Sequence, residues 1–160
     1  MDNKKSQAVP HSLSEIGEEL DVPFLKLLGV RLLKMGLGEG EIGLHLKPEH
    51  NNTWEVAHGG VLLTLMDVAM AIAARASDPY DRSVVTIELK NNFLQAANGN
   101  LRVLAKTVHN TATMAFCEAK LFNADGDVCC MASGTFKFLR KLPAKNSSGE
   151  RSINQDQRAK

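Results

Sequence analysis

The feature that most constrains the fold is one long apolar segment, AHGGVLLTLMDVAMAIAARAS, at residues 57–77. From Val61 to Ala74, twelve of the fourteen residues are apolar, and the two exceptions are Thr64 and Asp67. An Asp-Pro turn signal follows the segment, which predicts one long helix ending there. A helix that is apolar on nearly all sides must be covered on every side. We expect a curled sheet to cover one side and a second subunit to cover part of the rest.

The remainder of the body predicts one short helix and a set of strands. The segment DVPFLKLLG has a capping residue, an early proline and a C-terminal glycine, which predicts a helix at residues 21–29. Residues 30–49 predict two strands joined at Gly38-Glu39-Gly40. Four strands follow the long helix, and Asp125-Gly126 marks the hairpin between the last two. The order predicts an α+β fold with one antiparallel sheet of about five or six strands wrapped around one long central helix.

Alternation within the first strand after the long helix assigns its side chains to two faces. Val85, Ile87 and Leu89 alternate with three polar residues. Those polar residues are Thr86, Glu88 and Lys90. Simple alternation therefore places Thr86 on the polar face of its strand.

Length and charge indicate a single domain with polar ends. A chain of 160 residues is most simply one domain. We expect a flexible segment at residues 1–19, a folded body at 20–141 and a disordered polar tail at 142–160. The net charge is +1 and the basic residues are scattered, so nucleic acid is not an expected partner. No run of 18 apolar residues and no signal peptide is visible, so we expect no membrane association.

The cysteines and histidines give no pattern for a metal site. Cys117, Cys129 and Cys130 lie in apolar strand-like segments and are interpreted as small core residues in a reducing compartment, the cytoplasm. His45 and His50 lack a cysteine or carboxylate at a known ligand spacing. We therefore predict that the protein uses no metal and no other cofactor.

Two features of the long helix carry chemical interest. Gly59 and Gly60 stand in its first turn, where free backbone N–H groups can bind an oxyanion, although a simple glycine turn packed on a strand is the alternative. Asp67 interrupts the apolar segment and is either a structurally hydrogen-bonded carboxylate or a general base or nucleophile.

Helix geometry separates these two features. Gly59 and Asp67 are eight residues apart, which is about 12 Å at ~1.5 Å per residue. An amide and a carboxylate so far apart cannot act on one carbonyl carbon. Either the two groups serve different purposes, or the partner of each comes from another subunit. Two antiparallel copies of the helix would bring Asp67 of one subunit to Gly59 of the other, which predicts an obligate homodimer with two equivalent sites.

The segment HGGVLLTLMDVA resembles the motif H-G-G-x-x-x-x-x-x-D-x-A of hotdog-fold thioesterases, in particular the PaaI-like and acyl-CoA thioesterase 13-like branch. PFLKLLGV, VVTIELKNNFL and the closing hairpin extend the resemblance over most of the body. The resemblance implies a sheet wrapped around a helix, dimers that usually pair into tetramers, and hydrolysis of acyl- or aroyl-CoA without a metal.

The resemblance also implies roles for individual residues. Asp67 matches the acidic base, Gly59 the helix-entrance amide that binds the thioester oxygen, and His58 the motif histidine that steadies the helix start or contacts the thioester. Asn52 matches an asparagine six residues before the histidine, and Thr86 matches a hydroxyl residue that orients water, provided that one residue is inserted in the preceding loop. Contacts with the substrate are expected from four further residues: Gly60, Trp54, Phe93 and Arg140. Core packing is the alternative for the two aromatic residues, and an exposed strand edge for the arginine.

The leading interpretation is an enzyme that hydrolyses a small or medium acyl- or aroyl-CoA to the free acid and CoA. The alternative is a non-catalytic acyl-CoA-binding hotdog protein, for which Asp67 would be dispensable. A hydratase or dehydratase of the same fold is a third possibility, but the six-residue gap between Gly60 and Asp67 matches the thioesterase motif.

Overall fold

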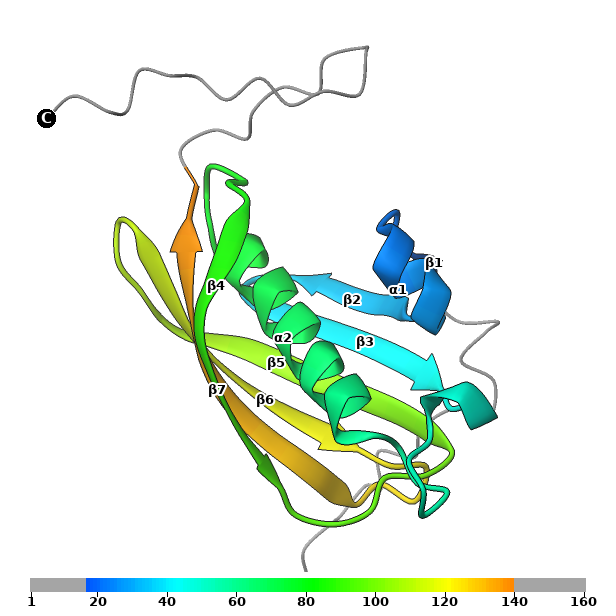
Figure 1. Cartoon of the computed structure of the whole chain (residues 1–160). Coiled ribbons are helices and arrows are strands. Elements are labelled where there is room, and N and C mark those ends of the chain that lie inside the picture. The colour runs from blue at the N-terminus through cyan, green and yellow to red at the C-terminus, as the bar shows by residue number, and fades with distance from the viewer. Residues whose placement is uncertain (1–16, 140–160) are drawn as a thin grey trace, which may run out of the picture.

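A curled antiparallel sheet wraps around one long helix in the computed structural model, which describes residues 17–139 (Figure 1). The seven strands lie in the order β1-β2-β3-β5-β6-β7-β4. Their bounds are Glu18–Glu19 (β1), Arg31–Gly36 (β2), Glu39–His45 (β3), Val84–Phe93 (β4), Asn100–Asn110 (β5), Met114–Phe122 (β6) and Val128–Phe138 (β7). The helices are α1 (Pro23–Leu28), the 3-10 turn η1 (Pro48–His50) and α2 (Gly59–Ala76).

The predicted α+β arrangement is confirmed, with differences at the N-terminal end. The sheet has seven strands because β1 pairs with β2, and β1 lies inside the segment predicted to be flexible. The connection between β2 and β3 is shorter than expected, since Glu39 and Gly40 already belong to β3. Helix α1 ends at Gly29 with a positive φ of 78°, as its glycine predicts, but its N-cap residue is Val22 and no side chain caps it.

Helix α2 lies in the hollow of the sheet and forms the centre of the core. Ala69, Met70 and Ala73 are fully buried against it. Gly40 of β3 is required for this approach, because a Cβ atom there would lie 2.6 Å from the backbone oxygen of Ala69. By length and composition alone α2 could cross a membrane. Its place inside the sheet accounts for the same apolar character.

The three cysteines are free and buried, as their sequence context predicts. Burial raises the pKa of the thiols of Cys117, Cys129 and Cys130. A raised thiol pKa disfavours the reactive thiolate, so these residues act as small core side chains.

Strand β4 is one of the two edges of the sheet, and it leaves apolar surface uncovered. Val85 is 41% exposed, Ile87 57% and Phe93 56%. The neighbouring side of α2 is open as well, since Leu63 is 41% exposed. An apolar edge strand with free backbone groups is a ready template for pairing with another strand.

A β-bulge in β4 overturns the side-chain assignment made from alternation. Thr86 pairs with Phe136 and Leu89 with Gly134, while the register shifts between Thr86 and Glu88. Because Phe136 and Gly134 share one face of β7, Thr86 and Leu89 share one face of β4. The extra residue at the bulge therefore turns Thr86 toward α2, away from the face of Glu88.

Candidate active site

The carboxylate of Asp67 meets the hydroxyl of Thr86 where α2 passes along β4. Thr86 Oγ1 donates a hydrogen bond of 2.7 Å to Asp67 Oδ1. Asp67 is half-buried and Thr86 is exposed, so solvent and a ligand can reach the pair. A carboxylate held by one hydroxyl and open on its remaining side is placed to accept a proton from water or to attack an electrophile.

The start of α2 leaves one backbone donor free. His58 is the N-cap residue, and its Nδ1 accepts a hydrogen bond of 2.9 Å from the Gly60 N–H. The carbonyl oxygen of His58 accepts from the N–H groups of Val61 and Leu62. Within residues 17–139, the N–H of Gly59 then has no hydrogen-bond partner. This free donor at the positive end of a helix is suited to bind an oxyanion.

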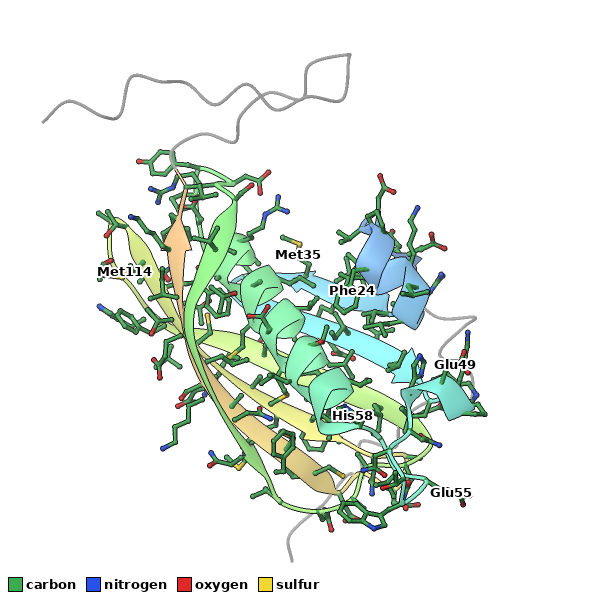
Figure 2. All side chains as sticks on the ribbon, in the orientation of Figure 1. Phe24, Met35, Glu49, Glu55, His58 and Met114 are labelled. Carbon is green, nitrogen blue, oxygen red and sulfur yellow. The ribbon has the colours of Figure 1, made fainter. Side chains whose placement is uncertain are left out.

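The capping bond also defines the chemistry of the His58 ring. Figure 2 shows this side chain at the entrance of α2. Because Nδ1 accepts a hydrogen bond, a neutral imidazole carries its proton on Nε2. His58 therefore steadies the helix start, one of its two expected roles, and keeps a ring N–H for a ligand.

Asn52 organises the loop that leads to His58. Its Oδ1 accepts hydrogen bonds from the backbone N–H of Trp54 at 2.9 Å and of Val56 at 3.4 Å. This Asx-type turn uses the side-chain oxygen, so the amide nitrogen is the group that can donate to a substrate. Glu55 completes the turn with a positive φ of 58°.

The two predicted aromatic contacts lie outside the core. Trp54 is 82% exposed on the loop, and Phe93 is exposed at the end of β4. Phe93 lies beside Gly59, since a Cβ atom at Gly59 would be 3.5 Å from the ring. The alternative of core packing within one subunit is therefore wrong for both residues.

Helix α2 and strand β4 together form a seam with the candidate groups at its two ends. Gly59 faces Phe93 at one end, and Asp67 is bonded to Thr86 at the other. Gly59 and Asp67 lie eight residues apart on the same helix, and the structure does not bring them together within one subunit.

Other candidates lie away from this seam. Arg140 falls outside the described residues. Among the other cations that could hold CoA phosphates, Arg102 is bonded to Glu41 at 2.6 Å and Lys106 lies 3.8 Å from Glu118. A cavity of about 660 Å³ is lined by residues such as Lys106 and Glu118, and neither Gly59 nor Asp67 borders it.

The histidines considered as metal ligands have other partners. His45 Nδ1 is bonded to Asn100 Oδ1 at 2.6 Å, and His50 Nδ1 accepts from the Lys47 N–H. His50 is buried in η1 and not in an open loop, and its burial lowers its pKa. Within the described part of the chain, no group of three or more His, Cys, Asp or Glu side chains could hold a metal ion.

One residue of the seam was missed by the sequence reasoning. Asn91 lies on β4 between Leu89 and Phe93, and both polar atoms of its carboxamide are buried without an oxygen or nitrogen partner among residues 17–139. The sequence did contain a signal for a buried polar residue, because Asn91 lies two positions beyond Leu89 and so shares its face of β4, which packs toward α2. The bulge at Ile87 hid this signal, because the alternation could not be followed across it.

Known proteins resemble this chain in sequence and in fold. Residues 55–130 match the family model described as "Thioesterase superfamily". A protein of Saccharolobus solfataricus named "Putative esterase" is 30% identical over 137 residues, which cover 84% of this chain and 96% of the relative.

Solved structures share the same fold. A conserved protein of Pseudomonas aeruginosa is 33% identical, with a TM-score of 0.70 over 74% of this chain and 94% of that one. The PaaI protein of the Escherichia coli phenylacetic acid degradation operon has a TM-score of 0.69 at 19% identity, over 81% of this chain and 89% of that one. The similarity to the Escherichia coli PaaI protein is one of fold, and it is consistent with the resemblance to the PaaI-like branch. With the esterase relative, the family match also supports hydrolase activity. This chain belongs to the thioesterase superfamily and has its hotdog fold.

Proposed function

We propose that the protein is an acyl-CoA thioesterase that hydrolyses a small or medium acyl- or aroyl-CoA to the free acid and CoA. The observation that carries this proposal is the 2.7 Å hydrogen bond between Thr86 Oγ1 and Asp67 Oδ1 at the open side of α2. A purely structural carboxylate would be expected to use its oxygens inside the core. The Asp67 carboxylate instead lies on the side of α2 that faces the accessible seam with β4.

The catalytic unit in this proposal is a homodimer, which pairs further into a dimer of dimers. The separation of Gly59 and Asp67 along α2 requires that the two groups of one site come from different subunits. The exposed apolar edge of β4 and the open side of α2 supply the surface for that pairing. Antiparallel pairing about a two-fold axis would produce two identical sites.

The reaction then follows from the groups at each end. The Gly59 N–H and the Asn52 amide nitrogen polarise the thioester oxygen, and His58 Nε2–H is available beside them. Asp67 of the facing subunit accepts a proton from a water held by Thr86, and the water oxygen bonds to the carbonyl carbon. The carbon–sulfur bond breaks as the tetrahedral intermediate collapses, and the CoA thiolate leaves. In the covalent variant of this route, the carboxylate attacks first and water hydrolyses the resulting anhydride.

The test is free-thiol release from a panel of acyl-CoAs by the wild-type protein and by Asp67→Asn. We expect Asp67→Asn to lose turnover by roughly 10²–10⁴-fold, because it removes the general base. Its circular dichroism and molar mass should match the wild type. Asp125→Asn, an exposed change in the β6–β7 turn, is the matched control.

The same panel separates the enzyme from a non-catalytic acyl-CoA-binding protein. A binding protein would retain acyl-CoA without releasing thiol and would be indifferent to Asp67→Asn. Absence of thiol release from every acyl-CoA tested, together with measurable binding, would replace the enzyme by that alternative.

A further inference from the structure

The seam between α2 and β4 contains a buried carboxamide that the reaction described above does not use. Both polar atoms of Asn91, Oδ1 and Nδ2, are buried, and neither has an oxygen or nitrogen partner at hydrogen-bond distance among the described residues. Buried polar groups in folded proteins are nearly always hydrogen-bonded, and an orphan pair of this kind calls for an explanation. The thiol of Cys130 interacts with this carboxamide, but a thiol is only a weak partner.

The position of Asn91 is fixed by the contacts at the two ends of the seam. Gly59 faces Phe93, and Asp67 is bonded to Thr86. Leu63 lies one helical turn from each of these two helix residues, on the same side of α2. Between Phe93 and Thr86, the residues of β4 on the face toward α2 are Leu89 and Asn91. Asn91 is two residues from Phe93, about 7 Å along β4, and its β7 partner is four residues from the partner of Thr86, about 13 Å. The carboxamide therefore lies nearer the Gly59 end of the seam.

This position has a defined relation to the proposed reaction centre. In the proposed site, the free Gly59 N–H holds the thioester carbonyl at the end of the seam beside Phe93. A substrate's acyl group that extends along β4 from this end would reach the Asn91 carboxamide about 7 Å from the carbonyl carbon.

The surroundings of the carboxamide can open to admit such a group. Leu63 and Phe93 are both substantially exposed, so their side chains can change rotamer without disrupting the core. The neighbours on β7 are small, since Asn91 pairs with Ala132. Asn91 is the one polar residue that an acyl chain would meet between Leu89 and Phe93 on this face of β4.

We propose that Asn91 determines acyl specificity by selecting acyl groups that carry a hydrogen-bonding oxygen, such as a hydroxyl, about five bonds beyond the thioester carbon. This inference rests on the proposed thioesterase function. The oxygen of the acyl group would provide the partner that the carboxamide lacks in the free protein. A site built to hydrogen-bond a substrate hydroxyl discriminates against the analogue without it, because the buried group is then left unpaired.

The test compares two acyl-CoAs of the same length, 5-hydroxypentanoyl-CoA and hexanoyl-CoA, in which a methyl group replaces the hydroxyl. We expect the wild type to have a kcat/KM at least tenfold higher for the hydroxyacyl substrate. Asn91→Leu, which keeps the side-chain shape and removes both polar atoms, should abolish this preference while retaining hydrolysis of hexanoyl-CoA. Asn91→Ser, whose hydroxyl is too short to reach, should have the same effect and serves if the leucine variant does not fold.

Asn92→Leu is the matched control, because the next residue of β4 points to the opposite face and is exposed. Asn92→Leu should keep the wild-type ratio of kcat/KM between 5-hydroxypentanoyl-CoA and hexanoyl-CoA. A wild type without the preference, or an Asn91→Leu variant with an unchanged ratio, would overturn this inference while the thioesterase proposal stands. No hydrolysis of any acyl-CoA by the wild type would refute the proposed function and this inference with it.

Discussion

Thr86 Oγ1 donates a 2.7 Å hydrogen bond to Asp67 Oδ1 across nineteen positions of sequence, and this bond ties the edge strand β4 to the central helix. The pair joins the only acidic residue of α2 to β4, one of the two edge strands of the sheet. The same contact orients the carboxylate and places the candidate site at the edge of the sheet.

Removing the hydroxyl of Thr86 tests that orientation. Thr86→Val keeps the β-branched shape but leaves the Asp67 carboxylate without its hydrogen-bond donor. We expect kcat to fall roughly 10–100-fold with little change in KM, because one hydrogen bond to a charged group is lost. Thr86→Ser should retain most of kcat. Steady-state kinetics on the best acyl-CoA measures both, and equal kcat for Thr86→Val and the wild type would contradict the assignment.

The cap of α2 predicts a stability effect. His58→Ala removes the acceptor of the Gly60 N–H, so we expect a loss of about 1 kcal/mol in the free energy of unfolding. His58→Asn should recover most of this loss, because asparagine is a favoured N-cap residue. Urea denaturation of the three proteins measures the difference, and an alanine variant as stable as the wild type would argue against the cap.

Two glycines are expected to respond in opposite ways to alanine. Gly40→Ala places a methyl group 2.6 Å from the Ala69 oxygen and 2.9 Å from the Ala73 nitrogen, so it should destabilise the fold by about 1–3 kcal/mol. Gly59→Ala meets only the Phe93 ring at ordinary contact distance. It should fold normally but lower kcat/KM roughly 10²-fold by displacing the thioester from the free N–H. Thermal unfolding and kinetics on both variants separate the two effects.

The edge of the sheet predicts the oligomeric state. Ile87→Lys puts a charge on the exposed edge of β4, and we expect the dimer dissociation constant to rise by roughly 30-fold or more, with a parallel loss of activity. Val108→Lys is the control, since Val108 of β5 is equally exposed but does not lie on an edge strand. Light scattering over a concentration series measures both proteins. An Ile87→Lys variant that remains dimeric would place the interface elsewhere.

Acid stability should depend on Asp78, which follows α2. Hydrogen bonds from the Arg82 side chain hold the pKa of Asp78 below its ordinary value. A carboxyl with a lowered folded-state pKa stabilises the fold above its unfolded pKa of about 3.9, and this stabilisation is lost as the pH falls through the folded-state pKa.

We therefore expect Asp78→Asn to unfold at a lower temperature than the wild type at pH 7, with a smaller difference below about pH 4. Calorimetric scans from pH 7 to pH 3 measure the gap between the two proteins. A gap that stays constant over this range would show that the ionised carboxylate is not the source.

Local sequence patterns were enough to predict much of this fold. The apolar run with one carboxylate predicted the central helix and its burial, and the glycine at 29 predicted the end of α1. Asp125-Gly126 predicted the β6–β7 hairpin. These features depend on neighbouring residues and on the period of the hydrophobic pattern, which are present in the chain before it folds. The HGG…D motif identified the candidate residues in the same way.

Tertiary structure decided what those residues can do together. Alternation placed Thr86 on the polar face, and only the bulge at Ile87, set by pairing with β7, turns it toward Asp67. The free Gly59 N–H and the orphan carboxamide of Asn91 are likewise products of packing. The face of the sheet on which a side chain lies depends on the register of its strand with a distant partner strand. Whether a polar group lacks a hydrogen-bond partner depends on every group packed around it. Neither is encoded in the local pattern of the sequence.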